Sequence, residues 1–127
     1  MHWGKKMVLV IDDDAFVREA ITDILEYEGI PLITAVSGEA GVVLYREQME
    51  KINLVLLDMS MPGMNGAETY CELQKINPSV PVLLSSGYTD YEINGCFPES
   101  GILGFLQKPY DLSELVSTIR QHLPKQT

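Results

Sequence analysis

The chain has 127 residues, of which 46% are hydrophobic and 21% charged, and its formal net charge is −9. This length suits one compact domain, and the composition excludes a disordered or fibrous chain. An acidic surface disfavours direct binding to nucleic acid or to anionic membrane, and the sequence lacks the run of about eighteen apolar residues that would predict a membrane segment.

Short apolar runs alternate along the chain with segments of helical spacing. The run Met7–Ile11 predicts a buried strand, and the spacing that follows predicts a helix over Ala15–Glu28 that Gly29 ends. The remaining elements are predicted, in chain order, as strand Pro31–Ala35, helix Gly38–Gln48 capped by Ser37, strand Leu54–Leu57, helix Gly66–Ile76, strand Val82–Ser85, a weak helix over Asp90–Phe97, strand Ile102–Leu106, and helix Leu112–Leu123, with Asp111 and Glu114 spaced as a capping box.

Five alternations of strand and helix predict an α/β fold. The expected architecture is a flavodoxin-like, doubly wound, five-stranded parallel sheet of order 2-1-3-4-5, with helices on both faces. Strands that read as continuous apolar runs agree with burial on both sides. We expect one domain over residues 6–123, with residues 1–5 and 124–127 as flexible ends or linker remnants.

Polar residues stand where the predicted strands end. They are Asp12 and Asp13 after the first strand, Asp58 after the third, Ser85 and Ser86 around the end of the fourth, and Lys108 after the fifth. Open α/β sheets bind ligands outside the carboxyl ends of their strands, so three carboxylates are predicted to converge there.

Converging carboxylates repel one another unless one is protonated or a cation binds. Oxygen ligands without histidine or cysteine favour a hard cation, Mg²⁺ or Mn²⁺. A carboxylate that is not used up by the cation can act as a nucleophile toward a phosphoryl group. The cation, the Lys108 ammonium and the Ser86 hydroxyl would then stabilise the moving oxygens.

Four segments carry a family resemblance. They are Val-Leu-Val-Ile-Asp-Asp-Asp at 8–14, Leu-Val-Leu-Leu-Asp-Met-Ser-Met-Pro-Gly-Met-Asn-Gly at 54–66, Val-Leu-Leu-Ser-Ser-Gly-Tyr at 82–88 and Phe-Leu-Gln-Lys-Pro-Tyr at 105–110. In this order and spacing they resemble the receiver domain of two-component response regulators, over about residues 6 to 123.

The resemblance implies a role for each matching residue. Asp58 would be the phosphoacceptor, and Lys108 would contact the phosphoryl group. Asp13 would bind Mg²⁺ directly and Asp12 mainly through water, with the main-chain carbonyl of Ser60 as a further ligand.

The resemblance also implies a switch. Ser86 would take the hydroxyl position and Phe105 the aromatic switch position, while Gly87 would be the small residue after Ser86. The Lys108–Pro109 bond is expected to be cis.

Several residues have simpler interpretations. One aspartate of 12–14 could be only a helix N-cap, and we assign that role to Asp14. Ser85 competes with Ser86 for the hydroxyl role, and counting from Pro81 favours Ser86.

Phe16 is either a core residue or part of an apolar patch with Ala15 and Tyr110, on which a phosphodonor helix would dock. Cys71 and Cys96 are interpreted as reduced thiols that pack on their helices in a cytoplasmic protein.

The predicted function is a phosphorylation switch. A histidine kinase or a histidine phosphotransfer protein would donate the phosphoryl group, and the chain would catalyse its own phosphorylation and slow dephosphorylation without turning over a separate substrate. A fused or separate output domain would read the change.

Three rivals remain open. The chain could be the C-terminal receiver of a hybrid sensor kinase, with the same chemistry. It could be a pseudo-receiver that binds partners without phosphorylation, although such a chain would be expected to lack acidic-pocket residues. A phosphatase would need turnover of small phosphomonoesters, and Ser60 stands where the second aspartate of that class would be.

Overall fold

The computed structural model describes residues 7–86, 102–108 and 111–123. Within these residues the strands are β1 (Met7–Ile11), β2 (Leu32–Ala35), β3 (Ile52–Asp58), β4 (Val82–Ser86) and β5 (Ile102–Gln107), and the helices are α1 (Ala15–Tyr27), α2 (Gly38–Gln48), α3 (Gly66–Ile76) and α4 (Leu112–His122). The strands form one parallel sheet of order β2-β1-β3-β4-β5, which confirms the predicted fold class.

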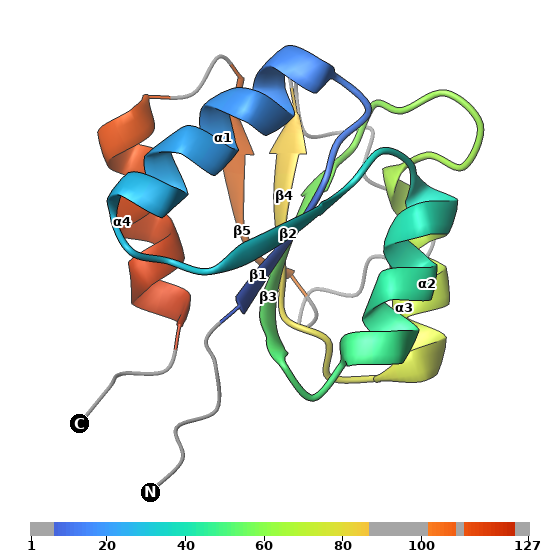
Figure 1. Cartoon of the computed structure of the whole chain (residues 1–127). Helices are drawn as coiled ribbons and strands as arrows, with labels where there is room; N and C mark the ends of the chain where they lie inside the picture. Colours follow the sequence, from blue (N-terminus) through green and yellow to red (C-terminus); the bar gives the residue numbers. More distant parts are fainter. Residues whose placement is uncertain (1–6, 87–101, 109–110, 124–127) are drawn as a thin grey trace, which may run out of the picture.

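The sheet lies between two layers of helices (Figure 1). Helices α1 and α4 cover one face, and α2 and α3 cover the other. Alternate residues of β1 point to opposite faces: Leu9 and Ile11 join the core under α2 and α3, whereas Val8 and Val10 join the core under α1 and α4. This two-sided burial explains why the central strands read as unbroken apolar runs.

Each described helix begins at a side chain that accepts backbone N–H groups. Asp14 caps α1 by accepting from Phe16 and Val17, and Ser37 caps α2 by accepting from Ala40. Both assignments confirm the sequence prediction. Gly29, which follows α1 with φ +75°, occupies the left-handed conformation that suits glycine after a helix.

The other two caps differ from expectation. A full capping box forms at α3, where the Asn65 side chain accepts from Glu68 and the Glu68 carboxylate accepts from the Asn65 amide. At α4, Asp111 accepts from Glu114, but the reciprocal bond is absent among the described residues, so only half of the predicted box forms.

The predicted bounds of β1, α2 and α3 are confirmed, and those of the other described elements differ by one or two residues at an end. The main difference is at β3, which runs from residue 52 to residue 58 and therefore includes Asp58 as its last residue. Pairing with β1 and β4 extends this strand beyond its apolar run, because backbone hydrogen bonds do not depend on side-chain hydrophobicity. The predicted weak helix over Asp90–Phe97 and the predicted flexible ends, residues 1–5 and 124–127, lie outside the described residues.

Cys71 on α3 is disulfide-bonded, so its interpretation as a reduced thiol is wrong for this structure. Two cysteines that are distant in a sequence carry no spacing signal, because only the fold decides which sulfur atoms meet. Cys96 lies outside the described residues. In the described part of the chain, no helix is both long enough and apolar enough to cross a membrane.

The contact between α2 and β1 gives a test of the core. A Cβ atom on Gly41 of α2 would lie 2.4 Å from Cδ1 and 2.7 Å from Cγ1 of the fully buried Ile11. We expect Gly41→Ala to lower the free energy of unfolding by about 1 kcal/mol or more, because overpacking outweighs the better helix propensity of alanine.

Urea denaturation would measure this effect. Ile11→Val removes the nearest atom, so the double variant should be more stable than the sum of the single effects predicts. Strict additivity would show that the two residues do not crowd each other.

Candidate functional site

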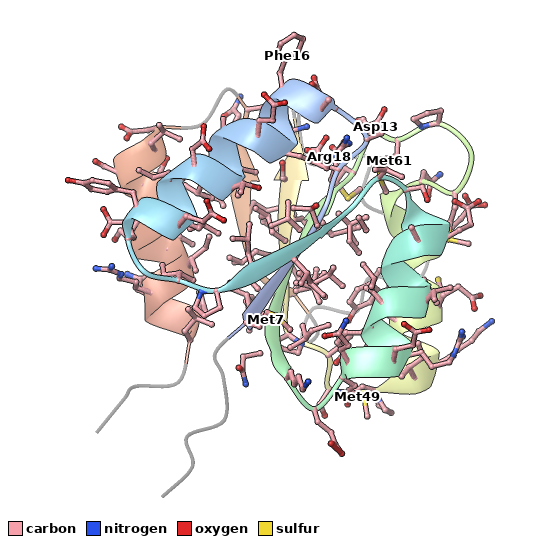
Figure 2. All side chains as sticks on the ribbon, viewed as in Figure 1. Met7, Asp13, Phe16, Arg18, Met49 and Met61 are labelled. Atoms are coloured by element: carbon pink, nitrogen blue, oxygen red, sulfur yellow. The ribbon has the colours of Figure 1, made fainter. Side chains whose placement is uncertain are left out.

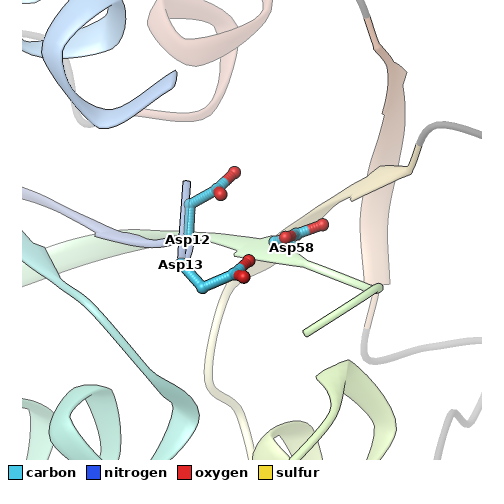
Figure 3. A group of neighbouring side chains, drawn as sticks. All are labelled: Asp12, Asp13 and Asp58. Atoms are coloured by element: carbon cyan, nitrogen blue, oxygen red, sulfur yellow. The ribbon is translucent and has the colours of Figure 1, made fainter. Parts of the chain in front are cut away.

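Three carboxylates meet at the carboxyl edge of the sheet (Figure 3). Asp12 and Asp13 directly follow β1, and Asp58 ends the neighbouring strand β3. One carboxylate oxygen from each residue lies within 4.8 Å of the others. The convergence predicted from the strand ends is therefore present in the structure.

Both the carboxylate and the backbone amide of Asp12 have partners in the structure. Its side chain is 2% exposed, its Oδ1 accepts from the Asp14 amide at 2.9 Å, and its Oδ2 lies 2.9 Å from Nζ of Lys108. The Asp12 amide also donates to the Ala35 carbonyl at the end of β2, at 3.2 Å. Each oxygen of this buried carboxylate therefore has a partner.

Asp58 is equally buried, at 2% exposure, and its carboxylate also has two partners among the described residues. Its Oδ1 accepts from the Ser60 amide at 3.2 Å and lies 3.3 Å from Nζ of Lys108. Burial and the negative charge of Asp12 raise the pKa of Asp58 from 3.8 to about 6, although Lys108 and the Ser60 amide act in the opposite direction. Near neutral pH the group is still mostly a carboxylate, the form that acts as a nucleophile.

Lys108 follows β5, two strands away from β3, yet its ammonium reaches both buried carboxylates. The predicted approach of Lys108 to the acidic residues is thus present. The Lys108 ammonium compensates only part of the charge of the three carboxylates. The remaining negative charge is what a bound cation would neutralise.

The donor set fits a hard divalent cation. The three residues offer carboxylate oxygens, and neither histidine nor cysteine belongs to the cluster among the described residues. Asp13 is exposed while Asp12 and Asp58 are buried, so the cluster opens to solvent on the side of Asp13. A Mg²⁺ ion that keeps several water ligands suits such a half-open site.

For the other predicted site residues, the structure gives a position but does not test the predicted role. Ser60 follows Asp58 by two residues and is bonded to it through its amide, whereas its predicted role concerns its carbonyl. Phe105 on β5 is 47% exposed. Ser85 is buried and pairs with Asp58 in the sheet, and Ser86 ends β4. The choice between the two serines stays a prediction, as do the roles of Ser60 and Phe105.

Phe16 is not a core residue. It is 84% exposed on the first turn of α1, beside the exposed Ala15, and Figure 2 shows its ring pointing away from the molecule. The core alternative is therefore wrong, because a side chain this exposed contributes little apolar burial. Tyr110, the third residue of the predicted patch, lies outside the described residues, as do Gly87 and Pro109.

One contact to the cluster was missed in the sequence. Nη1 of Arg18, on α1, donates to the main-chain carbonyl of Asp12 at 2.8 Å. An arginine six residues after an aspartate has no specific sequence meaning, because the contact depends on how α1 turns back over the end of β1.

The chain belongs to the response regulator receiver domain family. The family model matches residues 8–120, which include both acidic strand ends and Lys108. This match confirms the resemblance seen in the four sequence segments.

Two relatives show the contexts in which similar sequences occur. The chain is 34% identical over 123 residues to the DNA-binding response regulator MtrA of Mycobacterium bovis, covering 97% of this chain and 53% of MtrA. It is 30% identical over 123 residues to the sensor kinase CckA of Brucella abortus, covering 97% of this chain and 13% of CckA. The chain thus spans about half of the first relative and a small part of the second.

A solved structure confirms the fold. A chain in the complex of CheX, CheY, BeF₃ and Mg²⁺ from Borrelia burgdorferi superimposes with a TM-score of 0.82 at 27% identity, covering 91% of this chain and 87% of that one. Receiver domains bind Mg²⁺ at an acidic pocket, and in this chain Asp12, Asp13 and Asp58 form an acidic cluster at the carboxyl edge of the sheet.

The raised pKa of Asp58 predicts a pH dependence of stability in the absence of divalent cations. The unfolded carboxyl keeps its ordinary pKa of 3.8, whereas the folded one ionises at about 6. This contribution to stability is fully present below pH 3.8 and is lost as the pH rises through 6. In EDTA, we expect it to fall by about 1–2 kcal/mol between pH 5 and pH 7.5.

Urea denaturation at the two pH values would isolate this contribution by comparison with Asp58→Asn, which lacks the ionisable group. Asp14→Asn is the matched control, because asparagine also caps a helix, and it should follow the wild type. If Asp58→Asn showed the same pH dependence as the wild type, the assignment of the raised pKa to Asp58 would be wrong.

Proposed function

We propose that this chain is a phosphorylation-switched receiver in which Asp58 accepts a phosphoryl group from a phosphohistidine donor, with Mg²⁺ or Mn²⁺ bound at Asp12, Asp13 and Asp58. The observation that carries the proposal is the placement of a buried nucleophilic carboxylate within reach of both an ammonium and two further carboxylates. Family membership supports the same assignment.

The reaction can be written from these residues. A carboxylate oxygen of Asp58 attacks phosphorus, the bond from phosphorus to the donor imidazole nitrogen breaks, and an acyl phosphate forms. A cation held by Asp12, Asp13 and Asp58 would supply positive charge to the phosphoryl oxygens. Lys108, already 3.3 Å from Asp58, would stay beside the new phosphoryl group and neutralise part of its charge.

The switch is reversed by hydrolysis. Water attacks phosphorus, the bond to the Asp58 oxygen breaks, and phosphate leaves with the carboxylate restored. The chain therefore modifies itself and turns over no separate substrate. The phosphoryl group would change the contacts of Lys108 with Asp12 and Asp58, and Ser86 and Phe105 would carry this change to the surface.

Similarity to CckA supports a second context with the same chemistry. The chain would then act as the C-terminal receiver of a hybrid sensor kinase, with its donor histidine in the same protein. Similarity to MtrA supports a receiver that is joined to an output domain. In both contexts we place the domain in the cytoplasm, where the ATP that phosphorylates the donor histidine is present.

Acetyl phosphate with Mg²⁺ should add one phosphoryl group to the purified chain, as measured by intact-mass spectrometry. Asp58→Asn should abolish the addition, because the amide is not a nucleophile, and EDTA should suppress it in the wild type. The neighbouring variant Asp14→Asn should be phosphorylated normally. Undiminished labelling of Asp58→Asn would show that another residue is the phosphoacceptor. No labelling of the wild type by acetyl phosphate or by a phosphorylated donor protein would favour a pseudo-receiver.

The exposed Phe16 predicts a docking effect. If Phe16 contacts the donor helix, Phe16→Ala should slow transfer from a phosphorylated donor protein by about tenfold while leaving labelling by acetyl phosphate unchanged. Tyr27, which is 85% exposed at the other end of α1, provides the control Tyr27→Ala, which should leave both rates unchanged. Equal slowing of both routes in Phe16→Ala would exclude a docking role.

A further inference from the structure

Arg18 links helix α1 to the acidic cluster. Its Nη1 donates to the carbonyl oxygen of Asp12 at 2.8 Å, and its own amide donates to the Asp14 carbonyl at 3.0 Å. Figure 2 shows Arg18 beside Asp13, on the edge of the sheet where the carboxylates gather. The side chain is half-buried, which favours a lasting hydrogen bond over one that water replaces.

The carbonyl that Arg18 holds belongs to the peptide group between Asp12 and Asp13. A peptide group is planar, so fixing its oxygen also fixes the direction in which the chain enters Asp13. The Asp12 carboxylate has its own restraints in the Asp14 amide and Lys108. By contrast, no hydrogen bond or ion pair within the described residues holds the exposed carboxylate of Asp13.

We propose that Arg18 is a positioning residue for the divalent cation. By holding the peptide between Asp12 and Asp13, it keeps the Asp13 carboxylate aimed at the place where the carboxylates of Asp12 and Asp58 meet. This inference rests on the proposed cation site and adds a residue outside the ligand set.

Charge and positioning predict opposite effects for Arg18. As a cation beside three carboxylates, Arg18 lowers their attraction for Mg²⁺, so charge alone predicts tighter binding when it is removed. As the residue that holds the peptide between Asp12 and Asp13, Arg18 orients the Asp13 carboxylate. Positioning therefore predicts weaker Mg²⁺ binding when Arg18 is removed. The sign of the change in affinity therefore decides between the two roles.

The experiment compares Arg18→Met and Arg18→Lys by calorimetric titration with Mg²⁺ and with Mn²⁺. Positioning predicts a dissociation constant about tenfold higher for Arg18→Met and a smaller loss for Arg18→Lys, which keeps a hydrogen-bond donor at this position. Tighter binding by Arg18→Met, or unchanged binding by both variants, would overturn the proposal. If Arg18→Met does not fold, weaker binding by the folded Arg18→Lys supports the proposal and unchanged binding overturns it.

Arg120 provides a matched control. It also donates to a main-chain carbonyl, that of Glu28 at 3.1 Å, and it pairs with the Glu28 carboxylate at 2.8 Å, next to the opposite end of α1. Arg120→Met should leave the dissociation constants for Mg²⁺ and Mn²⁺ unchanged. Its unfolding midpoint in EDTA measures how much stability is lost when an arginine contact away from the cluster is removed.

A second readout needs no metal. In the cation-free protein, Arg18→Met should shift the NMR amide resonance of Asp13, whereas Arg120→Met should not. If the wild type itself binds neither Mg²⁺ nor Mn²⁺, the proposed cation site fails. If the wild type binds and the Arg18 variants match it, only the inference about Arg18 fails.

Discussion

Two carboxylates buried at the end of neighbouring strands, with one ammonium between them, are the constraint on which the rest of this structure depends. Asp12 and Asp58 are each 2% exposed, and Nζ of Lys108 lies 2.9 Å from the first and 3.3 Å from the second. Burying carboxylates is costly unless charge and hydrogen bonds compensate. A single ammonium compensates only in part, and the raised pKa of Asp58 is the result.

This incomplete compensation also explains how the site can work. In the proposed function, a pocket with excess negative charge would attract a divalent cation, and the same cation would then help the pocket to accept a phosphoryl group. A fully neutral pocket would gain stability but would have less affinity for the ion. The raised pKa of Asp58 in the cation-free state and the proposed chemistry therefore have the same electrostatic origin, which is the uncompensated negative charge of the cluster.

The surrounding fold brings backbone close to Asp58. A Cβ atom on Gly66, at the start of α3, would lie 2.7 Å from Cα of Met59 and 2.8 Å from the Asp58 carbonyl oxygen. Only a residue without a side chain lets α3 begin this close to the end of β3. The loop between β3 and α3 is thereby held at both ends, by the sheet and by the helix.

The order of elements and the identity of the acidic strand ends could be predicted from the sequence, because apolar runs, helical spacing and caps such as Asp14 are local signals. The resemblance to receiver domains then predicted a role for each of four residues, Asp12, Asp13, Asp58 and Lys108. What the sequence could not decide depends on distances between segments that are far apart along the chain. The exposure of Phe16 and the hydrogen bond from Arg18 to the Asp12 carbonyl both follow from how α1 packs on the sheet. Local patterns report which face of an element is apolar, whereas only the tertiary structure decides which atoms of two elements meet.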